Sequence, residues 1–421
     1  MRCERLTVTD DPKRTAAALR ELIPTPHEVR ETVGEIIEQV RAHGDEALIE
    51  YTRRFDTAGR DPEPLVVEPE ALAAAARALD PHVRHGVERA IENLEAVLAA
   101  GRSSADVAVE LGANRIVLRH APVARAAIYV PGGRAPYPST VVMGVVPARL
   151  AGVEHIAVCA PPQATGEVDP VILAACEITG ASAVYRMGGA QAIAALAYGT
   201  ESIAPVDVIV GPGNLYVQEA KRQVFGQVGI DGFAGPSDLL VIVSDGADTD
   251  PIALDLLAQA EHGSGTLVVA VSEAPEILKV FEQRIAEGAD TGAVTALVQV
   301  TDAEQALAVA EAFAPEHLQL IGRDAEALAP HVTRAGCLFV GAGAGTAFGD
   351  YIAGSNHILP TGGAARFAST LGPEHFLRRF SEVHIADATE LATSAAPLAR
   401  AEGFELHARS MEARIRDNDA Q

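Results

Sequence analysis

The sequence contains no tryptophan, and only 4% of its 421 residues are aromatic. Lysine is nearly as scarce. Lys13, Lys221 and Lys279 are the only three, and Lys221 lies in the polar run EAKRQ, so Schiff-base chemistry has almost no candidate residue. Hydrophobic residues make up 48% of the chain and charged residues 21%. This composition is typical of a soluble globular protein with an aliphatic, alanine-rich interior.

Positive charge is also in deficit, because 33 Lys and Arg residues face 57 Asp and Glu residues, giving a net charge of −24. Such a chain repels phosphate backbones and anionic lipids, so we expect neither a nucleic-acid nor a membrane partner. No apolar run approaches the roughly 18 to 20 residues that span a bilayer, and the N-terminal stretch MRCERLTVTDDPKR lacks the apolar core of a signal peptide.

The four cysteines, Cys3, Cys159, Cys176 and Cys337, have no CxxC or CxC spacing. This scatter indicates neither a disulfide framework nor a thiolate zinc site. We therefore expect reduced cysteines and a cytoplasmic location.

The length favours two domains with terminal additions. Residues 1–121 show mostly helical spacing, as in HEVRETVGEIIEQVRAHGDEALIEYTRRF, and are predicted to be a helical segment that packs on the body. Residues 122–237 and 238–375 each repeat short aliphatic runs, glycine or proline, and helical stretches. That rhythm predicts an α/β fold with two tandem Rossmann-like αβα domains, each a parallel sheet covered on both faces. Residues 376–421 are predicted to be a helical tail, too short for a core of its own.

The dinucleotide fingerprint GxGxxG is absent. GAGAG at Gly341 to Gly345 and GPGN at Gly211 to Asn214 are glycine-rich but lack the full spacing. The run YVPGGRAPYPSTVVMG follows a predicted strand. It is either a structural turn or, as its length and polarity favour, a rigid loop that faces a ligand at the carboxyl end of the strand.

The segment LLAQAEHG places Gln259 and His262 on one face of a predicted helix, with Glu261 directed elsewhere. Two such side chains suit a metal ion, although a histidine and a following glycine can also simply close a helix. In APEHLQL, Glu316 and His317 supply two titratable groups for proton transfer, with helix capping as the alternative.

The stretch GDYIAGSNHILPTGG contains Asp350, Asn356 and His357 in a glycine-rich setting, as expected of a loop that presents polar groups. Asp350 and His357 are metal-ligand types. With Gln259 and His262 they could complete a mixed oxygen and nitrogen zinc shell.

Taken together, these segments resemble the signature blocks of the histidinol dehydrogenases. The blocks run in order from Tyr129 to Arg366, and Glu402 and His407 extend the resemblance into the tail. They are YVPGGRAPYPSTVVM, MGGAQAIAALAYGT, VGPGNLYVQEAKR, AGPSDLLVI, QAEHG, APEHLQL and GDYIAGSNHILPTGGAAR.

The resemblance implies an aldehyde-dehydrogenase-like architecture and a zinc-dependent, NAD-linked enzyme that oxidises L-histidinol through L-histidinaldehyde to L-histidine. It implies Glu316 and His317 as the catalytic pair and a homodimer with shared active sites, in which the tail serves the neighbouring subunit. The implied zinc ligands are Gln259, His262, Asp350 and His407. The implied substrate contacts are these four with Ser237, His317, His357 and Glu402, and the implied NAD contacts are Tyr129, Gln191 and Asn214.

Glu402 and His407 are five residues apart, about 140° around an ideal helix, so one straight helix would not direct both to one site. Gly403 lies between them. We therefore predict a helix break over Ala401 to Phe404.

Some positions depart from the usual pattern of the family. Ala347 and Phe348 stand where Pro-Glu is common, Asp238 where Glu is usual, and Glu311 where Asn is frequent. Two alternatives follow: a dehydrogenase of the same fold that acts on another polar alcohol, or a non-catalytic metal-binding homologue. The presence of His317 disfavours the second.

Overall fold

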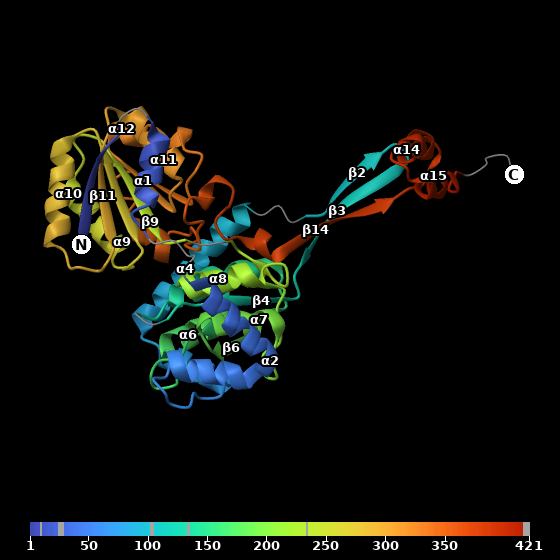
Figure 1. Cartoon of the computed structure of the whole chain (residues 1–421), viewed down its shortest axis with the longest axis horizontal. Helices are drawn as coiled ribbons and strands as arrows, with labels where there is room; N and C mark the ends of the chain where they lie inside the picture. Colours follow the sequence, from blue (N-terminus) through green and yellow to red (C-terminus); the bar gives the residue numbers. More distant parts are fainter. Residues whose placement is uncertain (9–10, 24–28, 102–104, 133–134, 233–234, 416–421) are drawn as a thin grey trace. The chain divides into compact units, whose positions relative to one another are not determined.

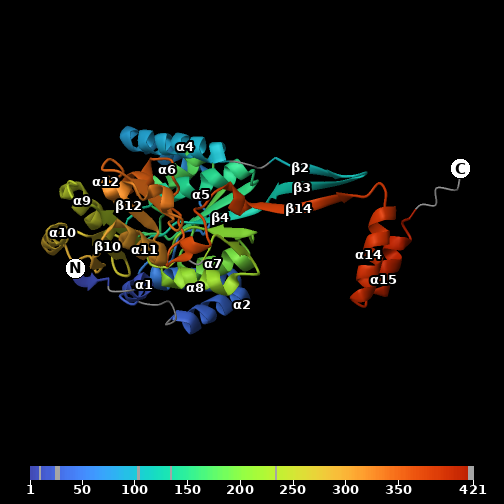
Figure 2. The same cartoon turned by 90° about the horizontal axis from the view of Figure 1, so that it is seen from above.

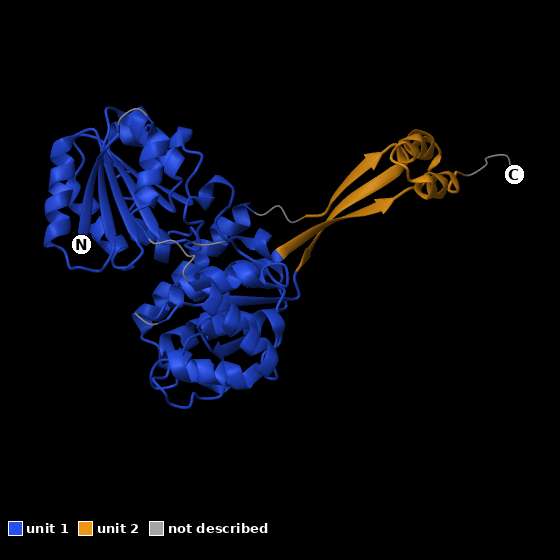
Figure 3. Ribbon diagram, in the orientation of Figure 1, with its two compact units in different colours: residues 1–101, 123–376 blue, residues 102–122, 377–421 orange. Residues whose placement is uncertain are grey.

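The computed structural model describes residues 1–8, 11–23, 29–101, 105–132, 135–232 and 235–415. The chain divides into two compact units (Figure 3). Unit 1 comprises residues 1–101 and 123–376, and unit 2 comprises residues 102–122 and 377–421. Each unit therefore combines segments that are distant in the sequence.

Unit 1 contains a five-stranded parallel sheet with the strand order β6-β5-β4-β7-β8. Its strands are short and aliphatic, and the helices between them cover both faces, as the alternating pattern predicts. The strands are β4 (Arg125–Tyr129), β5 (His155–Ala160), β6 (Ala183–Arg186), β7 (Val208–Val210) and β8 (Gly229–Ile230). The helices are α5 (Pro138–Ala151), α6 (Pro170–Thr179), α7 (Gly189–Tyr198) and α8 (Leu215–Val224).

A second parallel sheet in unit 1 has the order β1-β11-β10-β9-β12-β13. Buried clusters lie on both of its faces, with α9 and α10 on one side and α1 and α11 on the other (Figure 1). The strands are β1 (Arg2–Thr7), β9 (Asp238–Val243), β10 (Leu267–Ser272), β11 (Val294–Gln299), β12 (His317–Ile321) and β13 (Cys337–Val340). The helices include α9 (Thr249–Ala260), α10 (Pro275–Glu287), α11 (Ala303–Phe313), α12 (Arg323–Glu326) and α13 (Thr346–Tyr351). The prediction of an α/β fold with parallel sheets is confirmed.

The N-terminal segment is mostly helical, as predicted, and its helices pack on both halves of unit 1. α1 contacts α11, α2 contacts α7 and α8, α3 contacts α6, and α4 contacts α5. These helices are α1 (Pro12–Arg20), α2 (Arg30–Phe55), α3 (Pro69–Ala78) and α4 (Pro81–Gly101). Among the described residues, none of the helices is both long and apolar enough to cross a bilayer.

The segment is not helical throughout, which corrects the prediction for residues 1–121. Its first residues form β1, which pairs in parallel with β11, with Arg2 opposite Val294. β1 is a largely exposed edge strand with little apolar patterning of its own. Its structure depends on a partner nearly 300 residues away, and so no local signal reveals it.

Unit 2 begins with strands where the sequence predicted only helix. β2 (Val107–Leu111), β3 (Asn114–Pro122) and β14 (Leu377–His384) form an antiparallel sheet in the order β14-β3-β2. α14 (Thr389–Ala401) and α15 (Glu405–Glu412) follow and pack against each other (Figure 2). The predicted helix break is confirmed, since α14 ends at Ala401, Gly403 has a φ of 84°, and α15 starts at Glu405.

A buried ion pair fixes the loop after β7. The Lys221 ammonium donates to Asp231 and, at 3.0 Å, to the Gly211 carbonyl. The other Asp231 oxygen accepts from the Gly211 N–H at 2.7 Å. Gly211 has a φ of 119°, and a Cβ there would collide with the Tyr129 carbonyl oxygen. The pair thus holds Gly211, where only glycine fits, close against β4 at the edge that carries the GPGN sequence.

We expect Lys221→Met to lower the free energy of unfolding by about 3 kcal/mol, because it leaves the Asp231 carboxylate buried without its cation. Urea denaturation followed by circular dichroism measures the change. Lys279→Met, which removes an exposed lysine from α10, is the matched control and should change stability by about 0.5 kcal/mol or less. Equal losses in the two variants would show that the buried pair has no special role.

Candidate active site

A polar cluster lies at the amino ends of two neighbouring strands of the second sheet. Ser237 and Asp238 stand at the start of β9, and Glu316 and His317 stand at the start of β12. β9 and β12 are adjacent and parallel, with His317 opposite Leu239. The pairing therefore brings together residues that are almost 80 positions apart.

Glu316 is held by reciprocal hydrogen bonds with the start of β9. Its Oε2 accepts from the Ser237 hydroxyl at 2.6 Å and from the Asp238 N–H at 2.9 Å. Its own N–H donates to Asp238 Oδ1 at 2.7 Å. Glu316 is 7% exposed and Asp238 is fully buried. One carboxylate oxygen of Glu316 thus has a fixed direction.

Burial raises the pKa of the Glu316 carboxyl. Burial and the nearby Glu316 charge raise the pKa of Asp238 to about 7, against the opposing effect of Arg20. Arg20, from α1, places Nη1 4.0 Å from Asp238 Oδ2, and its guanidinium lies over the Phe313 ring. Sequence reasoning missed Arg20, because only the tertiary packing of α1 on α11 brings it to this cluster.

His317 bridges Asp238 and Asp350. Its Nδ1 donates to the Asp238 carbonyl oxygen at 3.3 Å, and its Nε2 lies 3.3 Å from Asp350 Oδ1. Both partners are acceptors, so both ring nitrogens carry hydrogen in this arrangement. Burial alone would lower the His317 pKa, but Glu316 and Asp350 outweigh it and raise the pKa to about 9. The negative charges of Glu316 and Asp350 therefore stabilise the protonated imidazole.

The expected metal ligands Gln259 and His262 reach the same cluster through Ser237. Gln259, in the last turn of α9, donates to the Ser237 hydroxyl at 2.7 Å, and His262 Nδ1 lies 3.4 Å from that oxygen. Asp350, on α13, joins the cluster through its contact with His317. Burial would raise the Asp350 pKa, but the hydrogen bond and charge of His317 outweigh burial and lower it.

Oxygen and nitrogen donors of the kinds that zinc accepts therefore surround one hydroxyl group. Among the described residues, no three His, Cys, Asp or Glu side chains form a ready metal cluster. Of the four expected ligands, Gln259 is an amide and His407 belongs to unit 2, so only His262 and Asp350 are residues of those types in unit 1.

His357 links Asp350 to the first half of unit 1. Its Nδ1 donates to the Asp350 carbonyl oxygen at 2.8 Å, and its Nε2 lies 3.2 Å from the Thr140 hydroxyl on α5. Burial lowers the His357 pKa, which favours the neutral ring. The neighbouring Asn356 donates to the Met143 carbonyl oxygen at 2.7 Å. This loop is therefore anchored on α5, a contact that the sequence pattern did not predict.

The two tail residues lie in unit 2. Glu402 is the C-cap residue of α14, and His407 lies in α15 with its ring 5.0 Å from that of Phe404. Both side chains are exposed. Within unit 2, neither is needed to fill a core.

The departures from the family pattern differ in their surroundings. Asp238 belongs to the cluster, where it accepts from the Glu316 N–H. Glu311 lies on α11 and accepts from the Thr333 N–H at 2.7 Å, so it holds a turn. Phe348 is 59% exposed on α13. Nothing in unit 1 explains its apolar character.

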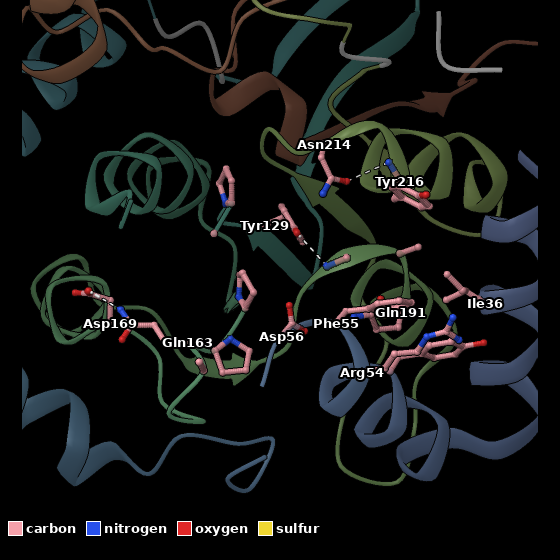
Figure 4. Close-up of a pocket in the computed structure, with 18 of the residues that line it drawn as sticks. Ile36, Arg54, Phe55, Asp56, Tyr129, Gln163, Asp169, Gln191, Asn214 and Tyr216 are labelled. Atoms are coloured by element: carbon pink, nitrogen blue, oxygen red, sulfur yellow. Dashed lines mark hydrogen bonds between the residues drawn. The ribbon is translucent and has the colours of Figure 1, made fainter. Parts of the chain in front are cut away.

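A cavity of about 1010 Å³ lies at the carboxyl ends of the first sheet (Figure 4). Tyr129, Gln191 and Asn214, the expected NAD contacts, all line it. The Tyr129 hydroxyl accepts from the Gly189 N–H at 3.1 Å, and Asn214 caps α8. The Gln191 amide nitrogen is buried without a hydrogen-bond partner among the described residues. The cavity has the position and size of a nucleotide site, although GxGxxG is absent.

Two glycines allow close packing of the loops beside this cavity. A Cβ on Gly132 would collide with Pro161, and one on Gly188 would lie 2.5 Å from the Pro161 Cβ. Pro131, Gly132 and Pro161 line the cavity, while Gly188 directly precedes α7. Glycine is thus required where these loops meet. The two glycines lie in different loops, so they do not form a GxGxxG motif.

Comparison with known proteins points to one family. The histidinol dehydrogenase family model matches residues 23–415. The chain is 42% identical to the histidinol dehydrogenase of Pseudomonas savastanoi pv. phaseolicola over 405 residues, covering 93% of this chain and 90% of the relative. It is 43% identical to that of Cereibacter sphaeroides over 401 residues, covering 92% of each.

The crystal structure of histidinol dehydrogenase from Elizabethkingia anophelis has a TM-score of 0.88 to this chain at 28% identity, covering 98% of this chain and 97% of that one. The likeness thus extends through sequence and fold over nearly the whole length. The chain belongs to the histidinol dehydrogenase family of oxidoreductases.

Proposed function

We propose that this chain oxidises L-histidinol through L-histidinaldehyde to L-histidine, the last steps of histidine biosynthesis, with NAD as the hydride acceptor and one zinc ion per subunit. One observation carries the proposal: Glu316, His317, Gln259, His262 and Asp350 form one connected network around Ser237. In a member of this family, that network supplies both a proton-transfer pair and metal donors. We propose a cytoplasmic location, which suits the four free cysteines.

The proposed metal ligands are Gln259, His262, Asp350 and His407. Zinc bound there would act as a template that orients the alcohol through a neighbouring nitrogen of the substrate. Ser237, His357 and Glu402 are proposed as further substrate contacts. Tyr129, Gln191 and Asn214 are proposed to hold the dinucleotide, which accepts one hydride in each half-reaction.

In the first half-reaction, the alcohol loses a hydride to NAD and its hydroxyl proton to His317, giving the aldehyde. His317 must first release the proton that faces Asp350. Asp350 would hold the cation, and its carboxylate would then oppose that release less strongly, because Asp350 is one of the groups that raise the His317 pKa.

In the second half-reaction, water adds to the aldehyde carbon while the Glu316 carboxylate accepts a proton from it. The hydrate then loses a hydride to a second NAD, giving the acid. The raised pKa of buried Glu316 suits a proton acceptor. The sum is one alcohol, one water and two NAD converted to one carboxylate, two NADH and three protons.

We expect two NADH per histidinol consumed, measured by absorbance against residual substrate.

Glu316→Gln should slow oxidation of the aldehyde by about 100-fold or more, because the general base is lost, while the first hydride transfer is slowed less.

Glu304→Gln, on the exposed face of α11, is the matched control and should retain activity. A yield of one NADH in the wild type would contradict the four-electron reaction. Equal losses in both half-reactions of Glu316→Gln would contradict the assigned role. No turnover of histidinol beside good turnover of another polar alcohol would favour a different substrate.

We expect elemental analysis of the dialysed protein to find about one zinc per subunit, and His262→Ala to lose metal and activity together. The same measurement distinguishes zinc from manganese. His331→Ala removes an exposed histidine elsewhere in unit 1 and should keep both metal and turnover. Wild-type protein without stoichiometric divalent metal, or normal turnover in His262→Ala, would refute the ligand assignment.

We further propose a homodimer in which Glu402 and His407 complete the site of the partner subunit. Inactive His262→Ala and His407→Ala proteins, mixed under conditions that allow subunit exchange, should then recover activity. In a mixed dimer, one site receives both lesions and the other none, so the expected recovery is up to about one intact site in four. Tails that served their own subunit would leave the mixture inactive.

A further inference from the structure

Asp56 brings an unpaired carboxylate oxygen to the cavity of the first sheet. It follows α2 directly, and its N–H donates to the Thr52 carbonyl oxygen at 2.9 Å, which fixes its backbone. Its side chain lines the cavity, and its Oδ2 is buried without a hydrogen-bond partner among the described residues. Burial raises the Asp56 pKa to about 6. Its carboxylate can therefore accept hydrogen bonds from a ligand in the cavity.

Two complementary groups lie around it. The Gln191 amide nitrogen is also buried and unpaired among the described residues, and it lines the same cavity. The Tyr129 hydroxyl accepts from the Gly189 N–H, so its own hydrogen can be donated to another group. Burial raises the Tyr129 pKa, and the Asp56 charge raises it further. Figure 4 shows Asp56 below Tyr129, between Gln163 and Gln191.

Glu35 and Asp169 are the other two carboxylates among the described lining residues, and Glu35 is exposed. Asp169 Oδ1 accepts from the Val171 N–H at 2.9 Å, and its Oδ2 accepts from Gln163 at 3.0 Å. Asp169 thus acts as a helix cap. Asp56 is the lining carboxylate with an unused buried oxygen.

The cavity suits the adenosine end of a dinucleotide. None of Ser237, Glu316, His317 and Asp350 is among its described lining residues, so the nicotinamide that reacts must extend beyond it. Phe55, Ile36 and the rings of Pro161 and Pro162 supply apolar surface of the kind that a purine covers. The ribose attached to that purine then falls within this cavity.

We propose that Asp56 binds the 2′- and 3′-hydroxyls of the adenosine ribose and thereby makes this chain prefer NAD to NADP. The assignment rests on the proposed function, since it takes the dinucleotide as the occupant. The carboxylate accepts both hydroxyl hydrogens, while the Gln191 amide donates to a hydroxyl oxygen. A 2′-phosphate would bring negative charge against Asp56 and remove one of the donors that it needs.

Dinucleotide binding to the full chain tests the assignment without turnover. The chain has no tryptophan, so the emission of bound NADH and NADPH can be followed without tryptophan background. The wild type should bind NADH at least about 10-fold more tightly than NADPH, and 2′-deoxy-NADH should bind about 10-fold more weakly than NADH, as expected for a lost hydrogen bond to a charged group. Asp56→Asn should lower the affinity for NADH and bring the NADH and NADPH affinities to within about threefold of each other.

Glu46→Gln is the matched control, because it removes one negative charge from an exposed side chain of the same helix, α2, that is not among the described lining residues of the cavity. It should leave the NADH to NADPH ratio unchanged within about twofold, since exposed charges are screened. An unchanged ratio in Asp56→Asn, or equal wild-type affinities for NADH and 2′-deoxy-NADH, would overturn the ribose assignment alone. The wild-type comparison decides the matter even if Asp56→Asn does not fold. Wild-type protein that binds neither NADH nor NADPH would overturn the proposed function as well.

Discussion

The reciprocal hydrogen bonds between Asp238 and Glu316 hold the amino ends of β9 and β12 together in a fully buried setting. Backbone pairing alone would set the register of the two strands but would leave the Glu316 side chain free to rotate. With Oε2 accepting from both Ser237 and the Asp238 N–H, the side chain has one orientation. His317 is the next residue, so the same bonds also fix its position on β12. Asp350, which contacts His317, and Gln259, which contacts Ser237, are positioned in turn.

The two polar regions of unit 1 lie at opposite ends of their strands. Tyr129 ends β4 and Asn214 follows β7, so the cavity forms at carboxyl ends, whereas Glu316 and Ser237 precede their strands. A dinucleotide that places adenosine in the cavity can reach the cluster only if these opposite edges of the two sheets lie close together. The bonds from His357 to Thr140 and from Asn356 to Met143 supply such a connection, because they join the loop after α13 to α5.

Much of this arrangement follows from local sequence, and the remainder depends on distant partners. The parallel sheets are predictable because buried strands read as aliphatic runs, and the break at Gly403 is predictable because glycine readily adopts positive φ. β1 and β14 were missed, since their partners are far away and their own residues are largely exposed. Residue types alone suggested a zinc shell of Gln259, His262, Asp350 and His357, whereas the joining of Glu316 to this group came only from the family resemblance. Spacing alone left Glu316 open to a role in capping or in proton transfer.

The positions of Arg20 and Asp56 in the structure were likewise not predicted, because no local sequence pattern indicates them. Both are charged residues at the ends of amphipathic N-terminal helices, where such residues usually face water. Packing reverses that expectation, because α1 places Arg20 beside the buried Asp238 and α2 ends with Asp56 in the cavity wall. Each helix is anchored by an apolar face on a different half of unit 1, in the clusters that contain Leu19 and Leu48. The N-terminal helices, which cover the two sheets, therefore also supply one charged group to the polar cluster at the start of β9 and β12 and one to the cavity.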